Sequence, residues 1–265
     1  MDITKELFNI GIIPVITIND AAKAVDLAKA VSDGGITCLE ITFRTGEARQ
    51  AIRNISGAMP EILVGAGTVL SVSQVDEAQS AGAKFIVSPG FNPKVVAHCI
   101  DCGIPVYPGC STPSDIEKAL EMGLTVVKLF PAEQLGGIDY INTISAPYPG
   151  LKFIPTGGIR EERFNYYLSS PKIIACGGSW IATNDMINES KFDLITANSR
   201  SAVMAALGFK LEKIAPGRLV LSSTNIQRTA HYLSRRGIEY IATTSSDAEI
   251  SSLTLNGEAA EIITR

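Results

Sequence analysis

The sequence has few of the residues on which metal and redox chemistry depend. Its 265 residues include two histidines and five scattered cysteines. A structural zinc site takes about four ligands, and the one close cysteine pair, Cys99 and Cys102, has no second pair to complete it. A redox role for this pair would need a thioredoxin-like context. We therefore predict small buried thiols and no metal site.

Charge of one sign and long apolar runs are also lacking. The 23 basic and 27 acidic residues are interspersed and give a formal net charge of −4, which excludes the footprint of a nucleic-acid or anionic-membrane binder. No apolar run approaches the roughly 20 residues of a membrane span. The polar segment 1–6 is followed by no secretory hydrophobic region. We expect a cytoplasmic protein with neither nucleic acid nor membrane as a partner.

Hydrophobic residues, at 46%, are abundant enough for a large core. From residue 11 to about 180, apolar segments of strand length alternate with helical patterns such as 20–32 and 72–81. The expected strands are Ile12–Thr17, Thr37–Phe43, Ile62–Thr68, Lys84–Ser88, Pro105–Pro108, Thr125–Phe130, Lys152–Pro155 and Ile173–Cys176. Eight strands alternating with helices predict an α/β fold, a (β/α)8 TIM barrel. A helix at Ile3–Phe8 precedes this barrel, and a last helix at Asp193–Leu207 ends at Gly208.

The segment 209–265 does not continue the alternation, so we expect a barrel domain at 1–208 and a small α+β appendage at 209–265. The expected elements of the appendage are strands at Phe209–Ile214 and Arg218–Ser222, a helix at Asn225–Arg235, and strands at Glu239–Thr243, Ser252–Leu255 and Glu261–Thr264.

One lysine interrupts an apolar strand. In the segment 124–131, Lys128 is the single charged residue, whereas a parallel strand covered on both faces is a nearly continuous apolar run. A buried ammonium is costly unless it is paired or gives up its proton, and only the neutral amine attacks a carbonyl to form an imine. The segment favours an imine-forming lysine. A lysine at a strand end whose amine reaches water is the alternative.

The second strand carries a polar face. Alternation places Glu40, Thr42 and Arg44 on one side and the apolar residues of segment 39–43 on the other. The apolar side should pack on helices, so the polar side points into the barrel, where branched apolar side chains are usual. An interior glutamate with an arginine near the mouth indicates a functional site, with a buried structural ion pair as the alternative.

Small residues end other strands at the same mouth. The third strand ends at Thr68, after two glycines and an alanine, and paired glycines follow the seventh strand at 157–158 and the eighth at 177–178. The loops after strands seven and eight commonly build a phosphate site from backbone N–H groups. The two glycine pairs together predict a phosphorylated ligand.

With these residues, the segment from 1 to about 207 resembles the 2-keto-3-deoxy-6-phosphogluconate (KDPG)/4-hydroxy-2-oxoglutarate aldolase family. The matching segments are Leu39-Glu40-Ile41-Thr42-Phe43-Arg44-Thr45, Gly65-Ala66-Gly67-Thr68, Val127-Lys128-Leu129-Phe130-Pro131-Ala132-Glu133, Thr156-Gly157-Gly158 and Gly178-Ser179. The resemblance implies that Lys128 forms a Schiff base and that Glu40 moves protons. It also implies substrate contacts at Arg44, Thr68, Pro89, Phe130 and Thr156, and phosphate contacts at Gly157, Gly158, Gly178 and Ser179.

The resemblance further implies a class I aldolase that cleaves KDPG to pyruvate and glyceraldehyde 3-phosphate, with a covalent imine on Lys128, no metal and a homotrimeric state. 4-Hydroxy-2-oxoglutarate and the galacto epimer of KDPG stay open as substrates, although the hydroxyl of Thr156 resembles the gluconate-derived branch. A metal-free phosphosugar epimerase or synthase and a non-catalytic phosphosugar-acid sensor are the rival functions. Neither needs an interior lysine paired with Glu40.

Residues 217–265 resemble half of a glyoxalase-like βαβββ module. Such modules usually carry a metal-binding histidine on the first strand, where this sequence has Arg218, so we expect no metal there. Half a module leaves a sheet edge and an apolar face uncovered. We predict that the appendage pairs within an oligomer or packs on its own barrel.

Overall fold

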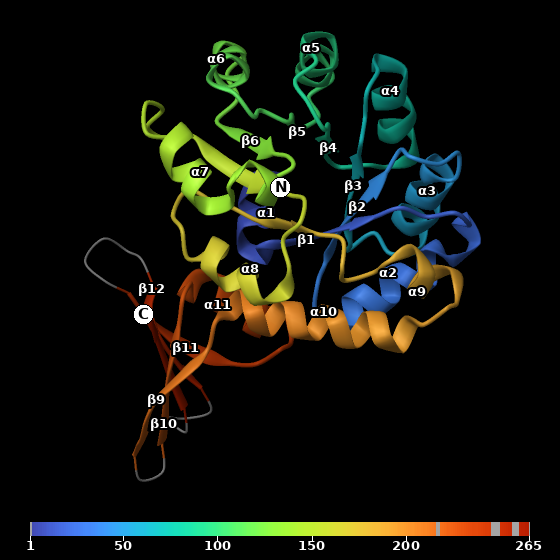
Figure 1. Ribbon diagram of the computed structural model, residues 1–265. Helices are drawn as coiled ribbons and strands as arrows, with labels where there is room; N and C mark the ends of the chain where they lie inside the picture. Colours follow the sequence, from blue (N-terminus) through green and yellow to red (C-terminus); the bar gives the residue numbers. More distant parts are fainter. Residues whose placement is uncertain (1, 216–217, 245–249, 256–259, 265) are drawn as a thin grey trace.

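The computed structural model describes residues 2–215, 218–244, 250–255 and 260–264. Eight parallel strands form its centre, and their arrangement can be followed in Figure 1. These strands are β1 Ile12–Ile16, β2 Cys38–Thr42, β3 Leu63–Gly67, β4 Ile86–Val87, β5 Val106–Tyr107, β6 Val126–Leu129, β7 Lys152–Pro155 and β8 Cys176–Gly178. Six of them pair in the order β5-β4-β3-β2-β1-β8, and β6 pairs with β7. Bridges between Gly109 and Lys128 and between Thr156 and Gly177 join the two pieces, so the strands close into the predicted barrel.

Helices surround this barrel and connect its strands (Figure 1). They are α1 Ile3–Ile10, the 3₁₀ turn Ala21–Lys23, α2 Ala24–Asp33, α3 Ala48–Ala58, α4 Val72–Ala81, α5 Pro93–Asp101, α6 Pro113–Glu121, the 3₁₀ turn Glu133–Leu135, α7 Gly137–Ile144, α8 Glu161–Leu168, α9 Asn184–Asn188 and α10 Phe192–Leu207. The predicted last helix is confirmed, because α10 ends at Gly208 in the left-handed conformation, with φ 55°. In the described part of the chain, no helix combines the length and apolar character that a bilayer crossing needs.

Local sequence signals fix where these helices begin and end. At the start of α4, Ser71 accepts a hydrogen bond from the N–H of Gln74 at 3.3 Å, and Gly82 ends the helix at φ 105°. A serine N-cap and a left-handed glycine C-cap satisfy backbone groups that the helix itself cannot pair. Because Val75 and Ala78 lie three residues apart on one face, both are buried against the barrel.

The eighth strand is displaced from its expected position. The prediction placed it at 173–176, whereas β8 covers Cys176–Gly178, so the glycine pair lies within the strand and does not follow it. A Cβ at Gly177 would lie 2.4 Å from Oγ1 of Thr156, and one at Gly178 would lie 2.9 Å from the ring of Phe164. Glycine therefore permits close packing in β8. The strand was predicted too early in the sequence because the apolar run that indicated it ends where β8 begins.

The C-terminal extension forms a five-stranded sheet with one helix. Its elements are β9 Lys210–Ala215, β10 Arg218–Ser223, α11 Ile226–Arg235, β11 Tyr240–Thr244, β12 Ile250–Leu255 and β13 Ala260–Thr264. The strand order is β11-β12-β13-β10-β9, and β10 and β13 pair in parallel. The order from β10 onward is the expected strand, helix and three strands. The side chain of Arg218, to which the expectation about metal referred, lies outside the described residues.

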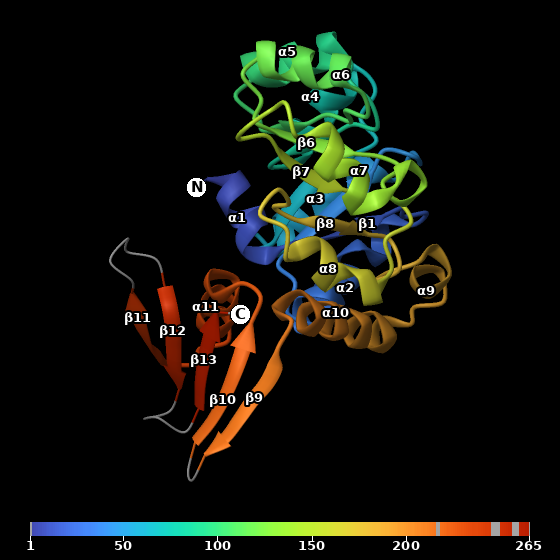
Figure 2. The ribbon, with the colours of Figure 1, turned by 60° about the vertical axis from the view of Figure 1, so that its left-hand side comes forward.

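Helix α11 lies on the barrel side of this sheet (Figure 2) and docks on α1. The guanidinium of Arg228 donates to the carbonyl of Phe8 from Nε and NH2, at 3.3 and 3.1 Å. The hydroxyl of Tyr232 donates to the carbonyl of Ile10 at 2.9 Å. Both side chains are buried, so the predicted packing of the extension on its own barrel is confirmed.

The predicted buried thiols are present at four of the five cysteines. Cys38, Cys99, Cys110 and Cys176 are buried, whereas Cys102 is half-buried. Burial raises the pKa of the Cys99 and Cys110 thiols to about 12. All five are free, so Cys99 and Cys102 form no disulfide.

Candidate active site

Two ionisable side chains meet inside the barrel. Strand β6 carries Lys128 and strand β2 carries Glu40, and their side chains are 6% and 2% exposed. Nζ of Lys128 lies 3.7 Å from Oε1 of Glu40, which is too long for a hydrogen bond. Among the described residues, Oε1 has no hydrogen-bond partner. Buried polar atoms in native proteins are usually satisfied, so this oxygen is available to a substrate or a water.

The backbone around the pair makes room for it. A Cβ on Gly67, in the neighbouring strand β3, would lie 2.0 Å from Oε1 of Glu40. The backbone N–H of Lys128 donates to the carbonyl of Pro108, and its carbonyl accepts from the N–H of Cys110, both at 2.9 Å. Glycine in β3 therefore provides the space that the carboxyl occupies, and pairing with the segment after β5 fixes the lysine.

The polar residues predicted on one face of β2 have two different roles. Glu40 and Thr42 are buried within the strand, and Oγ1 of Thr42 donates to the carbonyl of Ile16 at 2.9 Å and lies 2.9 Å from Oγ1 of Thr17. Thr42 therefore ties β2 to β1. Arg44 lies in the turn after the strand and is exposed, so its guanidinium can meet a ligand at the mouth.

A pocket of about 560 Å³ opens at the carboxyl ends of β7, β8 and β1. The predicted site residues that line it are Arg44, Phe130, Thr156, Gly157, Gly158 and Ser179. Phe130 links the pocket to the buried pair, because Nζ of Lys128 lies 5.4 Å from the centre of its ring. Oγ1 of Thr156 is buried and has no hydrogen-bond partner among the described residues. The pocket thus contains a buried hydroxyl that a ligand can use.

Besides the buried Lys128 and Glu40, three predicted site residues are not part of this pocket lining. Thr68 follows β3 with φ 56° and is half-buried, as is Pro89 after β4. Gly178 is buried in β8, and its neighbour Gly177 lines the pocket in its place. The glycine pair belongs to the strand, where alternate residues face opposite sides, so Gly177 faces this pocket, and the phosphate contact of Gly178 stays a prediction.

The glycine loop after β7 is held in a shape that leaves its amides free. Gly157 and Gly158 have φ values of 101° and 78°, which residues with a Cβ rarely adopt. The carbonyl of Gly157 accepts from the N–H of Glu133 at 3.1 Å. In the part of the chain that the structure describes, neither loop N–H group donates to a protein acceptor. Unpaired amides at a pocket are suited to bind an anion such as phosphate.

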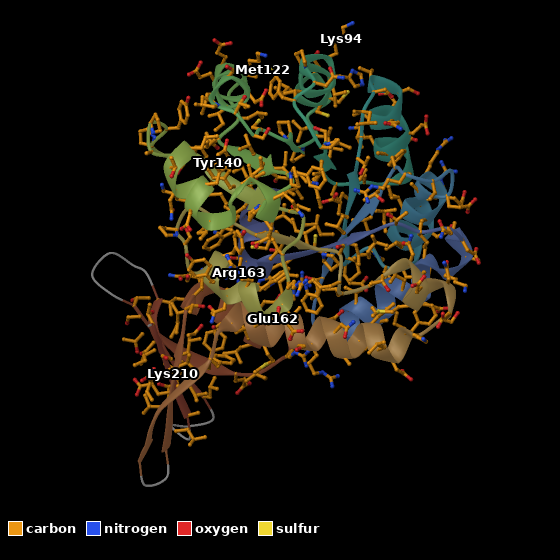
Figure 3. The ribbon with its side chains drawn as sticks, viewed as in Figure 1. Lys94, Met122, Tyr140, Glu162, Arg163 and Lys210 are labelled. Atoms are coloured by element: carbon orange, nitrogen blue, oxygen red, sulfur yellow. The ribbon has the colours of Figure 1, made fainter. Side chains whose placement is uncertain are left out.

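Glu133 also anchors the loop from behind. Its carboxylate accepts a hydrogen bond from the hydroxyl of Tyr167 and lies 3.9 Å from Nε of Arg163, a side chain labelled on α8 in Figure 3. Burial, followed by the hydrogen bond to Glu133, raises the pKa of Tyr167, so the phenol stays protonated and donates. The contacts of the Glu133 carboxylate therefore hold the residue that supports the glycine loop in a fixed position.

Gly177 belongs to the glycine pair from which a phosphate site was predicted, whereas sequence reasoning missed several other residues of the pocket, namely Val15, Thr17, Ile159, Ala182, Thr183, Asn184 and Asp185. Oγ1 of Thr183 accepts from the N–H of Met186 at 3.4 Å and caps the short helix α9. A threonine followed by an acidic first turn is a signal for a helix start. Applied to residues 183–185, it would have predicted a helix start beside the glycine pair, where such barrels often place a phosphate.

A (β/α)8 barrel with a buried lysine beside a glutamate, beneath a pocket rimmed by glycine amides, defines a class I, lysine-dependent aldolase. The chain belongs to the KDPG and KHG aldolase family, whose sequence model matches residues 3–198. KHG denotes 4-hydroxy-2-oxoglutarate. The match covers the barrel and ends before the extension.

Individual relatives agree with this assignment. A 2-dehydro-3-deoxy-phosphogluconate aldolase of Treponema pallidum is 46% identical over 201 residues, which are 76% of this chain and 96% of the relative. A KHG/KDPG aldolase of Escherichia coli K12 is 39% identical, over 74% of this chain and 92% of the relative. A crystal structure of KDPG aldolase from Legionella pneumophila, with pyruvate captured as a covalent carbinolamine intermediate, superposes with a TM-score of 0.72. It is 36% identical, over 75% of this chain and 97% of that one.

Proposed function

We propose that this protein is a class I aldolase that cleaves KDPG to pyruvate and glyceraldehyde 3-phosphate. The observation that carries the proposal is the buried ion pair of Lys128 and Glu40, with Nζ 3.7 Å from Oε1, an oxygen that accepts no hydrogen bond from the described residues. The names of the relatives support the substrate, and the covalent pyruvate adduct of the Legionella enzyme supports the chemistry.

The reaction follows from the chemistry of the pair. Neutral Lys128 attacks the C2 ketone, and loss of water from the carbinolamine leaves a protonated imine. Glu40, directly or through a water, carries protons in these steps and removes the proton of the C4 hydroxyl. The C3–C4 bond then breaks, its electrons form an enamine, and glyceraldehyde 3-phosphate leaves. Protonation of the enamine and hydrolysis of the imine release pyruvate, so the imine supplies the electron sink and no metal is required.

The remaining predicted residues are assigned to binding. Arg44 and Thr68 hold the substrate carboxylate through a charge-assisted contact, and Pro89 and Phe130 contact the substrate beside the lysine. The amides of Gly157 and Gly158, together with Ser179 after β8, bind the phosphate. The two loop amides, which donate to no acceptor in the described part of the chain, and the exposed Ser179 in the pocket wall support this assignment.

Two further substrates belong to the same reaction class. 4-Hydroxy-2-oxoglutarate is named for the E. coli relative, and the galacto epimer of KDPG differs at one hydroxyl. The buried hydroxyl of Thr156, which has no hydrogen-bond partner among the residues that the structure describes, favours KDPG, because a side chain that hydrogen-bonds one substrate hydroxyl discriminates against the epimer that places it elsewhere.

The test is cleavage of KDPG by purified protein, with pyruvate release as the readout. Lys128→Met should abolish cleavage, whereas Lys29→Met, on an exposed lysine paired with Asp33, should leave it unchanged. A phosphosugar epimerase would release no pyruvate from either protein. A sensor would bind KDPG without cleaving it, and its binding would survive Lys128→Met.

We also propose that the protein is a cytoplasmic homotrimer built from a barrel domain at 1–208 and a partial glyoxalase-like domain at 209–265. Light scattering should give three times the mass of the 28.2-kDa chain. A mass of one or two chains would contradict the trimer.

A further inference from the structure

A cluster of three different side chains lies on the outside of the barrel, between α4 and α5. Asp76 is on α4, His98 is on α5, and Cys102 caps the end of α5. Nε2 of His98 lies 2.7 Å from Oδ1 of Asp76 and 3.6 Å from Sγ of Cys102. The three ligand atoms all lie within 4.8 Å of one another.

Both contacts converge on the same nitrogen, which distinguishes the cluster from a catalytic relay. In a Cys–His–Asp relay, the thiol and the carboxylate face opposite nitrogens of the ring. Here Asp76 and Cys102 both face Nε2 of His98. Because an oxygen, a nitrogen and a sulfur atom lie within 4.8 Å of one another, one ion placed among them reaches all three.

The separations suit zinc. With bonds of about 2.0–2.1 Å to nitrogen and about 2.3 Å to sulfur, two ligands of a tetrahedral zinc lie roughly 3.5 Å apart, close to the 3.6 Å between His98 and Cys102. The contact between His98 and Asp76 would lengthen by about half an ångström to admit the ion, which an exposed aspartate can do by a small rotation of its side chain.

The positions of the three residues leave the cluster accessible to solvent. The side chains of His98 and Asp76 are 28% and 60% exposed, and Cys102 is the half-buried cysteine of the five. His98 and Cys102 are four residues apart, so they lie on one face of α5. Lys94, four residues before His98, points outward from the same helix in Figure 3. The lysine–glutamate pair lies inside the barrel and shares no residue with the cluster.

We propose that Asp76, His98 and Cys102 form a surface site for a zinc-like divalent cation, with water as the fourth ligand. Zinc accepts oxygen, nitrogen and thiolate ligands together, and thiolate disfavours magnesium and calcium. The ion would link α4 to α5 and would take no part in the aldolase chemistry. The prediction of no metal site from the sequence rested on the cysteine pair and the two histidines and did not consider Asp76, which lies on another helix.

The test is titration of the metal-free full chain with Co²⁺, which gives a thiolate-to-cobalt absorption band in the near ultraviolet when cysteine is a ligand. We expect the band to saturate at one cobalt per chain and to disappear when zinc is added. Cys102→Ser should abolish the band. Asp76→Asn, on an exposed residue, should weaken binding by about tenfold or more, since even loss of a residue that only supports a ligand weakens metal binding by about 10–100-fold.

Cys99→Ser is the matched control, because Cys99 is fully buried three residues from Cys102 and should keep the band. Alkylation of the native protein, mapped by mass spectrometry, provides a second readout in which zinc should protect Cys102. If the cluster is only a histidine–aspartate ion pair, the protein will give no cobalt band and zinc will not protect Cys102 from alkylation. Either result would overturn the proposal. A band that persists in Cys102→Ser would do the same.

Discussion

At the scale of single residues, the surroundings of Glu40 leave room for its carboxyl group and leave one carboxylate oxygen available to a substrate. The carboxyl lies where a side chain on Gly67 would otherwise be, and one of its oxygens has no hydrogen-bond partner among the described residues. Thr156 likewise presents an unpartnered hydroxyl to the pocket. Leaving buried polar atoms without hydrogen bonds lowers the stability of the folded protein. The Glu40 oxygen and the Thr156 hydroxyl are therefore best explained as groups that hydrogen-bond to a bound ligand.

Gly67→Ala tests whether the position of Glu40 matters for turnover. The added Cβ would lie 2.0 Å from the carboxylate oxygen and must displace it, and a displacement of about 1 Å can lower a rate by roughly 100-fold. We expect kcat for KDPG cleavage to fall by that order. Gly57→Ala in α3, where a Cβ meets open space, is the control and should leave kcat unchanged. An unaltered kcat in Gly67→Ala would contradict the role of Glu40.

Thr156→Val tests the basis of substrate choice. Valine keeps the shape of threonine but removes the hydroxyl, so a hydrogen bond worth about 1 kcal/mol is lost from the preferred substrate. We expect kcat/KM for KDPG to fall by roughly fivefold relative to that for its galacto epimer. The ratio of the two kcat/KM values is the measurement, and an unchanged ratio would show that Thr156 does not read the hydroxyl.

At the scale of elements, the interface between α11 and α1, which we call the seam, joins the extension to the barrel. Gly11 ends α1 at φ 75°, and a Cβ there would lie 2.4 Å from Nε of Arg228, so glycine both ends the helix and admits the guanidinium. Burial lowers the pKa of Arg228 and raises that of Tyr232. Tyr232 therefore remains a neutral phenol that donates to the end of α1.

Tyr232→Phe tests the contribution of this seam to stability. The change removes a hydroxyl that donates at 2.9 Å to the buried carbonyl of Ile10, and such a bond contributes about 0.5–1.5 kcal/mol. We expect the free energy of unfolding, measured in urea, to fall by about 1 kcal/mol. Tyr166→Phe removes the hydroxyl of an exposed tyrosine and should change it by less than about 0.5 kcal/mol. An equal loss of unfolding free energy in the two variants would contradict a stabilising role for the seam.

At the scale of the whole molecule, the sequence predicted the barrel and the buried pair, because both depend on local patterns. Alternating apolar segments marked the strands, and Lys128 and Glu40 were evident as polar residues in apolar runs. The docking of Arg228 on Phe8 joins residues 220 positions apart, which no local pattern encodes. The pocket wall at residues 182–185 was missed because the eighth strand was placed too early.

The extension provides a prediction at the same scale. Because α11 covers the carbonyl end of α1 and buries Arg228 and Tyr232 there, removal of residues 210–265 should lower the thermal midpoint of unfolding or change the mass in solution. The active-site pair lies in the barrel, so residual pyruvate release should persist at temperatures where the shortened chain is folded. Unchanged stability and unchanged mass together would contradict a structural role for the extension.

Borohydride trapping shows directly whether Lys128 forms an imine with the keto acid. The protein is incubated with pyruvate, reduced with borohydride, digested and analysed by mass spectrometry. We predict a reduced pyruvate adduct on the peptide that contains Lys128, and none on that peptide after Lys128→Met. Folded protein that gains no adduct in excess pyruvate, or gains it on another lysine, would contradict the account.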